Sequence, residues 1–228
     1  MRKSALFLSA VLALTAAPAA ANDLVTSTVT VTVEEASFGS QGGSERIVGM
    51  MPPALPRGIA AYGPFRVLDA TRAALVDVTD SRSPAQFAAM LKAHPGIAVL
   101  EMLDCPGTED DRANLALGRL IHGRGIATHV PAGGSVRSGG VELFLAGRQR
   151  RIDDGAEFAV HAWEDEDGRE ATDFPADAPQ NRAYLDYYRE MGMTPQQASA
   201  FYAMTNSVPF EQARWLTAAD MRVWVSLN

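Results

Sequence analysis

The sequence is poor in cysteine: Cys105 is the only one among 228 residues. A single cysteine cannot form an internal disulfide, so the hydrophobic core must supply the stability of the chain. Histidine is also scarce, and His94, His122 and His129 lack the close sequence spacing of zinc ligands. We therefore expect neither a bound metal nor a cofactor.

Basic residues are outnumbered by acidic ones, 20 to 27, and the formal net charge is −7 at pH 7. Nucleic acids and anionic membranes repel an acidic chain, so neither is expected as a partner. After the first 21 residues no apolar run approaches the roughly 18 residues of a membrane-spanning helix. Stable membrane insertion is therefore not expected.

The first 21 residues have the pattern of a cleaved signal peptide. Arg2 and Lys3 precede an apolar run over residues 5–16, and three small alanines end at Ala21. The pattern predicts a periplasmic or secreted protein cleaved after Ala21, and a cytosolic N-terminal helix is the alternative. Beyond the signal peptide we expect an appendage over residues 22–64, with one exposed strand at residues 24–35 and loops after it. A single domain is then expected over residues 65–228.

Strand-like and helix-like segments alternate from residue 65 onwards. Alternation of this kind produces right-handed βαβ units and a mostly parallel sheet, so the predicted fold class is α/β. Capping-box patterns at Thr194 and Thr217 predict two helices near the C-terminal end. The predicted buried strands are residues 74–78, 97–103 and 126–130, and the helices between them begin near Ser83 and Ala113.

A glycine-rich loop over residues 131–140 contains Ser138, and a strand-like run ends at His161. Ligands of parallel sheets bind beyond the carboxyl ends of the strands, where this loop and residues 105–111 are expected. Backbone N–H groups at the start of a helix after Ser138 would favour a developing oxyanion, and His161 could accept the hydroxyl proton. From these residues alone, a turn serine and a core histidine remain the alternative.

An ordered set of short motifs connects these residues to a known family. The turn Asp104-Cys105-Pro106-Gly107 after the strand at 97–103 is similar to the SPGG turn of the Clp protease subunit. Next come Ser138-Gly139-Gly140, Leu145-Ala146-Gly147, Arg150-Arg151 and Phe158-Ala159-Val160-His161. In this order, residues 74–162 resemble the Clp protease proteolytic subunit and crotonase-like superfamily, and more closely its exported, periplasmic bacterial branch.

The resemblance implies a fold and a role for each site residue. The fold is a mostly parallel sheet of repeated ββα/βα units with helices on its faces. Ser138 would be the nucleophile and His161 the general base, with an oxyanion hole from the backbone N–H of Gly139 and that of Gly107 or Thr108. Thr108 replaces a second glycine of the family turn, which keeps a backbone donor but narrows the loop.

The third catalytic residue is where the sequence departs from the family. Residues 214–218 resemble the stretch after the Clp aspartate, whose place falls at Ala213. Glu211 is the nearest acid that could orient His161, and a histidine with no such partner would lose about 10⁴-fold in rate by triad logic. Asn206, Glu164 and Asp165 are further candidates.

The predicted function is an exported serine hydrolase, peptidase-like or esterase-like, acting on a peptide or a small ester or amide. The missing acid and Thr108 favour an alternative, a non-catalytic binding or scaffold protein on the same fold. Clp-type folds often stack into rings, so a homo-oligomer is a further expectation. Cys105 is expected to be a small buried thiol rather than a nucleophile.

Overall fold

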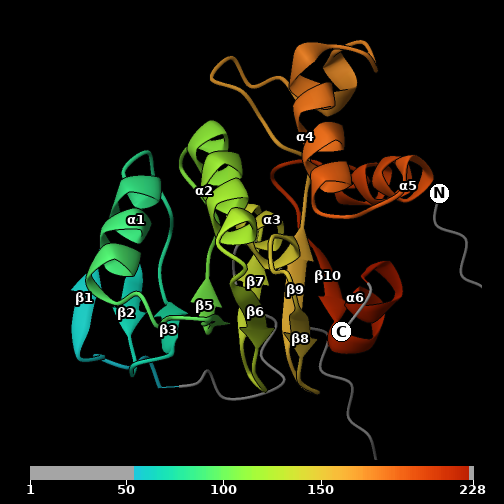
Figure 1. Ribbon diagram of the computed structural model, residues 1–228. Coiled ribbons are helices and arrows are strands. Elements are labelled where there is room, and N and C mark those ends of the chain that lie inside the picture. Colours follow the sequence, from blue (N-terminus) through green and yellow to red (C-terminus); the bar gives the residue numbers. More distant parts are fainter. Residues whose placement is uncertain (1–53, 226–228) are drawn as a thin grey trace, which may run out of the picture. The chain divides into compact units, whose positions relative to one another are not determined.

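The computed structural model describes residues 54–225 (Figure 1). The predicted signal peptide and the strand expected near residues 24–35 lie outside this range. The strands are β1 (Ala60–Tyr62), β2 (Phe65–Val67), β3 (Arg72–Leu75), β4 (Val99–Met102), β5 (Asp104–Cys105), β6 (Ala127–Val130), β7 (Ser135–Arg137), β8 (Arg150–Ile152), β9 (Glu157–Val160) and β10 (Arg214–Thr217). The helices are α1 (Ser83–Ala93), α2 (Asp111–Gly123), α3 (Gly139–Leu145), the 3₁₀ turn η1 (Ala171–Asp173), α4 (Pro179–Glu190), α5 (Pro195–Thr205) and α6 (Ala218–Trp224).

The strands form two sheets. The six-stranded sheet has the order β1-β2-β3-β4-β6-β8, and the four-stranded sheet has the order β10-β9-β7-β5. All pairs from β3 to β8 in the first sheet are parallel, as are β5, β7 and β9 in the second. Antiparallel pairs occur at one edge of each sheet. The predicted α/β class with mostly parallel strands is therefore confirmed.

Before α2 and before α3, the chain forms one strand of each sheet. It passes from β4 to β5 and then to α2, and from β6 to β7 and then to α3 (Figure 1). These are the repeated ββα units that the family resemblance implies. The prediction that the segments of β5 and β7 belong to loops is wrong, because strands of two or three residues show no readable alternation.

Residues 153–155 form a corner between two sheets rather than a hairpin turn. The strand before the corner, β8, pairs with β6, whereas the strand after it, β9, pairs with β7 and β10. Gly155 has φ 83°, a left-handed conformation that glycine adopts without steric cost. These residues therefore carry the chain from the six-stranded to the four-stranded sheet.

Helix α3 is buried along its whole length. Its apolar side chains join the main core, and the Phe144 ring lies 5.2 Å from the ring of Phe158 on β9. Burial of one such side chain is worth about 1.5–3 kcal/mol, so α3 is firmly fixed against the four-stranded sheet. The residue that precedes α3, Ser138, therefore stands on a rigid support.

The two predicted capping boxes are present. Thr194 Oγ1 accepts a hydrogen bond from the Gln197 N–H at 3.2 Å, and Gln197 Oε1 accepts one from the Thr194 N–H at 3.0 Å. Thr217 and Asp220 make the same reciprocal pair at the start of α6. Both boxes satisfy backbone donors that a helix start leaves free, which fixes where α5 and α6 begin.

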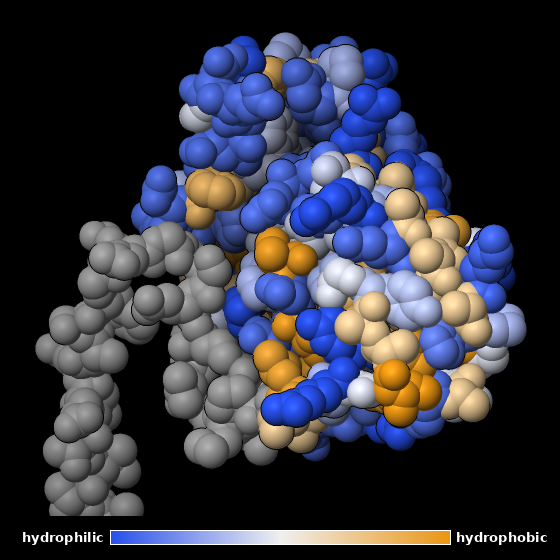
Figure 2. All heavy atoms as spheres, turned by 90° about the vertical axis from the view of Figure 1, so that its left-hand side faces the viewer, coloured by the Kyte–Doolittle hydropathy of each residue, from blue (hydrophilic) through white to orange (hydrophobic). Residues whose placement is uncertain are grey.

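Large apolar side chains are exposed only at separate points of the described surface. They are Leu55, Ile59, Phe210 and Val223. On the face drawn in Figure 2, hydrophobic residues lie among hydrophilic ones. Within residues 54–225, each helix is too short or too polar to cross a membrane.

Candidate active site

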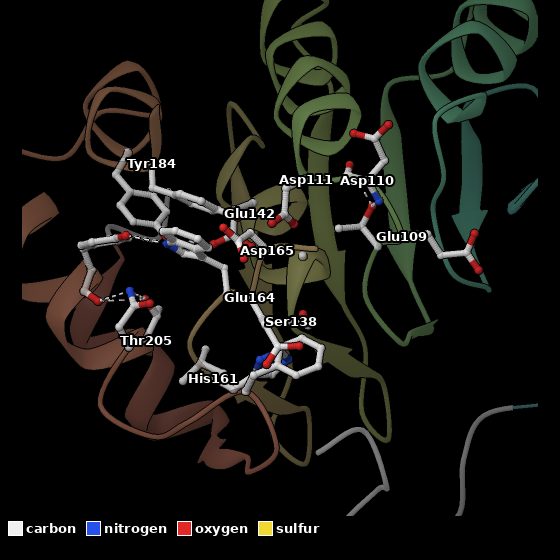
Figure 3. A pocket seen from close by; sticks show the side chains of 18 of the residues that line it. Glu109, Asp110, Asp111, Ser138, Glu142, His161, Glu164, Asp165, Tyr184 and Thr205 are labelled. Atoms are coloured by element: carbon white, nitrogen blue, oxygen red, sulfur yellow. Dashed lines mark hydrogen bonds between the residues drawn. The ribbon is translucent and has the colours of Figure 1, made fainter. Parts of the chain in front are cut away.

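The strand register brings Ser138 and His161 to the same edge of the four-stranded sheet. Strands β7 and β9 are parallel neighbours, with Arg137 opposite Ala159. The Ser138 N–H donates to the Ala159 carbonyl at 2.9 Å, so the pairing continues one residue beyond β7. His161 directly follows β9. The two predicted residues thus leave adjacent strands at their carboxyl ends, and both line one cavity (Figure 3).

Ser138 has a strained backbone. Its φ of 48° and ψ of −129° make it the one non-glycine residue with positive φ in the described part of the chain. Such a conformation costs on the order of 1–3 kcal/mol and persists only where the surroundings enforce it. Here Ser138 forms the sharp turn between β7 and α3. A strand-to-helix turn of this kind projects the nucleophilic serine in α/β-hydrolases.

The loop after β5 reaches the Ser138 side chain. β5 pairs with β7, and Gly107 follows it with φ 138°. A Cβ atom added to Gly107 would lie 3.0 Å from Ser138 Cβ and 3.4 Å from its Oγ. A side chain here would therefore crowd the hydroxyl, and only a glycine lets the loop backbone approach it.

Peptide orientation leaves two backbone donors for an oxyanion. The Gly107 carbonyl accepts from the Thr79 N–H at 3.1 Å, so the N–H of the same peptide unit, that of Thr108, points the opposite way. The Ser138 carbonyl accepts from the Val141 N–H at 2.9 Å, which turns the Gly139 N–H out of the helix start. The Ser138 N–H is not available, because it is bonded to strand β9.

A buried asparagine that the sequence analysis did not single out holds this loop to α3. Asn114, only 2% exposed on α2, donates from Nδ2 to the Gly139 carbonyl at 2.6 Å. Its Oδ1 accepts from Thr79 Oγ1 at 3.0 Å, and Thr79 Oγ1 also lies 3.3 Å from the Gly107 carbonyl. One side chain thus links the two peptide segments that carry the candidate oxyanion donors.

We expect Asn114→Ala to lower the free energy of unfolding by about 2–3 kcal/mol, because it leaves buried partners unsatisfied on both sides. Urea denaturation measures this change. Asn114→Asp is the matched variant: it keeps an acceptor for Thr79 but removes the donor to Gly139. Equal stability of wild type and Asn114→Ala would contradict the assigned link.

His161 is oriented by a backbone carbonyl. Its Nδ1 lies 2.8 Å from the Ala162 oxygen, and because a carbonyl only accepts, Nδ1 must carry the proton. Nε2 is then the free acceptor, as a general base requires. The ring also packs edge-on against Phe210, with 4.9 Å between centroids. The tautomer is therefore fixed without a third side chain.

The structure does not bring the predicted acid to His161. Glu211 is exposed in the turn that follows Phe210, it does not line the cavity, and no hydrogen bond or ion pair joins it to His161. Its position before β10 sends the side chain to solvent. The other candidates, Asn206, Glu164 and Asp165, line the cavity but make no hydrogen bond with His161.

The cavity has a volume of about 540 Å³ and an acidic lining. Ser138 and His161 both line the cavity, but their side chains are not hydrogen-bonded to each other. No cluster of three metal-ligating side chains occurs in residues 54–225. The lining includes Thr108, Glu109, Asp110, Asp111, Gly139, Glu142, Trp163, Glu164, Asp165, Glu166, Tyr184, Tyr188, Tyr202, Asn206 and Phe210.

Cys105 is buried in the core beneath the site. Burial raises the pKa of its thiol far above the usual range, so the reactive thiolate does not form at neutral pH. The side chain lies close to the Leu75 carbonyl, at 3.8 Å. Cys105 therefore has the inert position that the sequence analysis expected of it.

No protein-family model and no curated protein matches the chain. Among solved structures it is similar to a ClpP1 mutant from Listeria monocytogenes, at 15% identity and a TM-score of 0.46, over 68% of this chain and 88% of that one. It is also similar to the 1510-N membrane protease specific for a stomatin homolog from Pyrococcus horikoshii, at 13% identity and a TM-score of 0.42, over 69% and 72%. Likenesses at this level leave the chemistry of the site to be argued from its own geometry.

Proposed function

We propose that the chain is an exported serine hydrolase that cleaves a peptide or a small ester or amide. The observation that supports this most is the local arrangement at Ser138. A strained serine begins a buried helix in the same cavity as His161, whose Nδ1 proton is already committed to a carbonyl. The export part of the proposal depends on the sequence of residues 1–21 alone.

The chemistry follows the usual order of acyl transfer. Ser138 Oγ attacks the substrate carbonyl carbon while His161 Nε2 takes the hydroxyl proton. The carbonyl oxygen becomes an oxyanion between the Thr108 and Gly139 N–H groups, and a preorganised donor of this kind is worth about 10²–10³ in rate. His161 then protonates the leaving amine or alcohol, which leaves an acyl ester on Ser138. A water that gives its proton to His161 hydrolyses the ester.

The Ala162 carbonyl takes the orienting role that an acid has in a triad. It holds the productive tautomer but carries no full negative charge, so it stabilises the imidazolium less than a carboxylate does. We therefore expect a modest turnover rate. We also expect the Ser138–His161 hydrogen bond to form when substrate binds, as catalytic hydrogen bonds often tighten in the complex.

Labelling with a fluorophosphonate probe tests the proposal. Intact-mass analysis of the purified protein should show one adduct, and peptide sequencing should place it on Ser138, because only an activated hydroxyl attacks the phosphorus. The adduct should disappear in His161→Ala but remain in His94→Ala and Glu211→Gln. Labelling at another residue, or labelling of Ser138 that persists in His161→Ala, would refute the proposed mechanism.

A non-catalytic binding protein is the second candidate. The observation in its favour is the missing hydrogen bond between Ser138 and His161 in the structure. If this candidate is correct, the probe gives no adduct while peptides still bind in the cavity. Titration of Ser138→Ala with fluorescent peptides measures that binding independently of catalysis.

A further inference from the structure

We infer that the cavity beside Ser138 selects a positively charged side chain, the lysine or arginine of a peptide substrate, and that Glu142 is its specificity residue. The inference rests on the proposed function and names its substrate class. It begins from the charge of the cavity wall. Among the described residues, seven carboxylates line it, and no lysine or arginine does.

Glu142 is the innermost of these acids. It is 7% exposed on the buried helix α3, four residues after Ser138, and both residues line the cavity. Its Oε1 accepts from the Tyr188 hydroxyl at 2.7 Å. Within residues 54–225 no cation pairs with it. A buried carboxylate without a counter-charge destabilises the fold, and a cationic ligand bound beside it would supply the missing charge.

Part of the cavity wall is aromatic. The Trp163 and Tyr184 rings are stacked with centroids 6.4 Å apart, and Trp163 Nε1 donates to the Tyr202 hydroxyl at 2.6 Å. Aromatic faces attract lysine and arginine, and the attraction grows when water is excluded. A lysine or arginine side chain has an apolar stem and a charged end. The aromatic rings would contact the stem, and the carboxylate would pair with the charged end.

Two of the other acids of the wall, Asp110 and Asp165, are already engaged within the chain. Asp110 accepts from the Ala113 N–H at 2.9 Å as the cap of α2, and Asp165 is paired with Arg169 at 2.8 Å. Figure 3 shows Asp111 and Glu142 close together in the cavity above Ser138. Asp111 accepts a hydrogen bond from Tyr184, and Glu142 accepts one from Tyr188. Neither acid is paired with a lysine or arginine of the described chain, so a bound ammonium or guanidinium group would relieve their mutual repulsion.

The selection should depend on pH. Burial raises the pKa of Glu142 to about 7, and the charge of Asp111 adds to the effect. Below that pH the side chain becomes neutral and the attraction for a cation is lost; above it the attraction is complete. Groups that face Glu142 are Asp111 of α2 and Tyr184, Tyr187 and Tyr188 of α4.

Two reporter substrates test the inference, one with lysine and one with the uncharged norleucine before the scissile bond. We expect kcat/KM at pH 8 to favour lysine by about 30-fold or more, the effect of one buried charge pair. Glu142→Gln keeps an acceptor for Tyr188 and should abolish the ratio, whereas Glu190→Gln, on the exposed surface of α4, should leave it unchanged. The ratio of the two kcat/KM values, unlike each rate, does not depend on protonation of His161. This ratio should decrease when the pH is lowered below about 7, because Glu142 then becomes neutral.

Binding separates this inference from the proposed function. Fluorescent versions of the same two peptides are titrated with the Ser138→Ala variant. This measurement of affinity does not require catalysis. Preference for lysine there supports the cation site even if the protein hydrolyses neither reporter and the hydrolase proposal fails. Equal affinity for both peptides, or a lysine preference that survives in Glu142→Gln, overturns it. If Glu142→Gln does not fold, Asp111→Asn should reduce the preference by about 3-fold, and no reduction counts against the inference.

Discussion

Ser138→Ala is expected to reduce hydrolysis of the lysine reporter by at least ~10³-fold, because it removes the atom that forms the acyl ester. Activity that remains would come only from binding and the oxyanion donors. Initial rates under saturating and limiting substrate measure the loss in kcat and kcat/KM. Ser199→Ala, at an exposed serine of α5, is the control and should retain full activity.

A second replacement at the same position separates strain from chemistry. Ser138→Ala keeps a Cβ atom at φ 48°, whereas Ser138→Gly removes it and can adopt this conformation without steric cost. Neither variant should hydrolyse the reporter. Ser138→Gly should nevertheless unfold with a free energy about 1 kcal/mol higher than Ser138→Ala. Equal stabilities would mean that the backbone at Ser138 is not strained and that the turn is no adaptation for catalysis.

Structural features that depend on residues close together in the sequence could be predicted. The capping boxes at Thr194 and Thr217 were predicted because the side chain and the N–H that it satisfies are three residues apart. Long apolar runs also predicted β4 and β6. The placement of Ser138 and His161 at one sheet edge followed from motif order, and the register of β7 and β9 accounts for it.

Features that depend on non-local pairing could not be predicted in this way. β5 has two residues and joins the four-stranded sheet only because β7 lies beside it. Asn114 looks like an ordinary polar residue of an amphipathic helix, since its partners Thr79 and Gly139 lie 35 and 25 residues away. No local pattern could reveal a hydrogen bond that spans three elements.

The group that orients His161 could not be read from the sequence. His161 Nδ1 contacts a backbone carbonyl, and every residue possesses one. Glu142 is different, because a readable signal existed: it is the single charged residue in the apolar run from Val141 to Ala146. A charge in an otherwise buried helix is rarely retained without a partner or a role.

Gly107→Ala should lower kcat by about 10²-fold while leaving the lysine preference intact. The added Cβ would lie 3.0 Å from Ser138 Cβ, and φ 138° is strained for any residue with a side chain. The loop must move, and displacement of the Thr108 N–H removes one oxyanion donor, an effect of about 10²–10³ in rate. Steady-state kinetics with both reporters measures the loss.

Gly125→Ala is the matched control for that experiment. Gly125 also has positive φ, 71°, but a Cβ atom there would meet nothing within 4 Å. Both variants should lose stability in urea denaturation, since alanine is strained at either position. Only Gly107→Ala should lose activity. If both variants keep kcat within about 3-fold of wild type, the Gly107–Thr108 loop does not stabilise the oxyanion, because loss of one donor costs far more than that. The donors would then have to be sought elsewhere in the cavity.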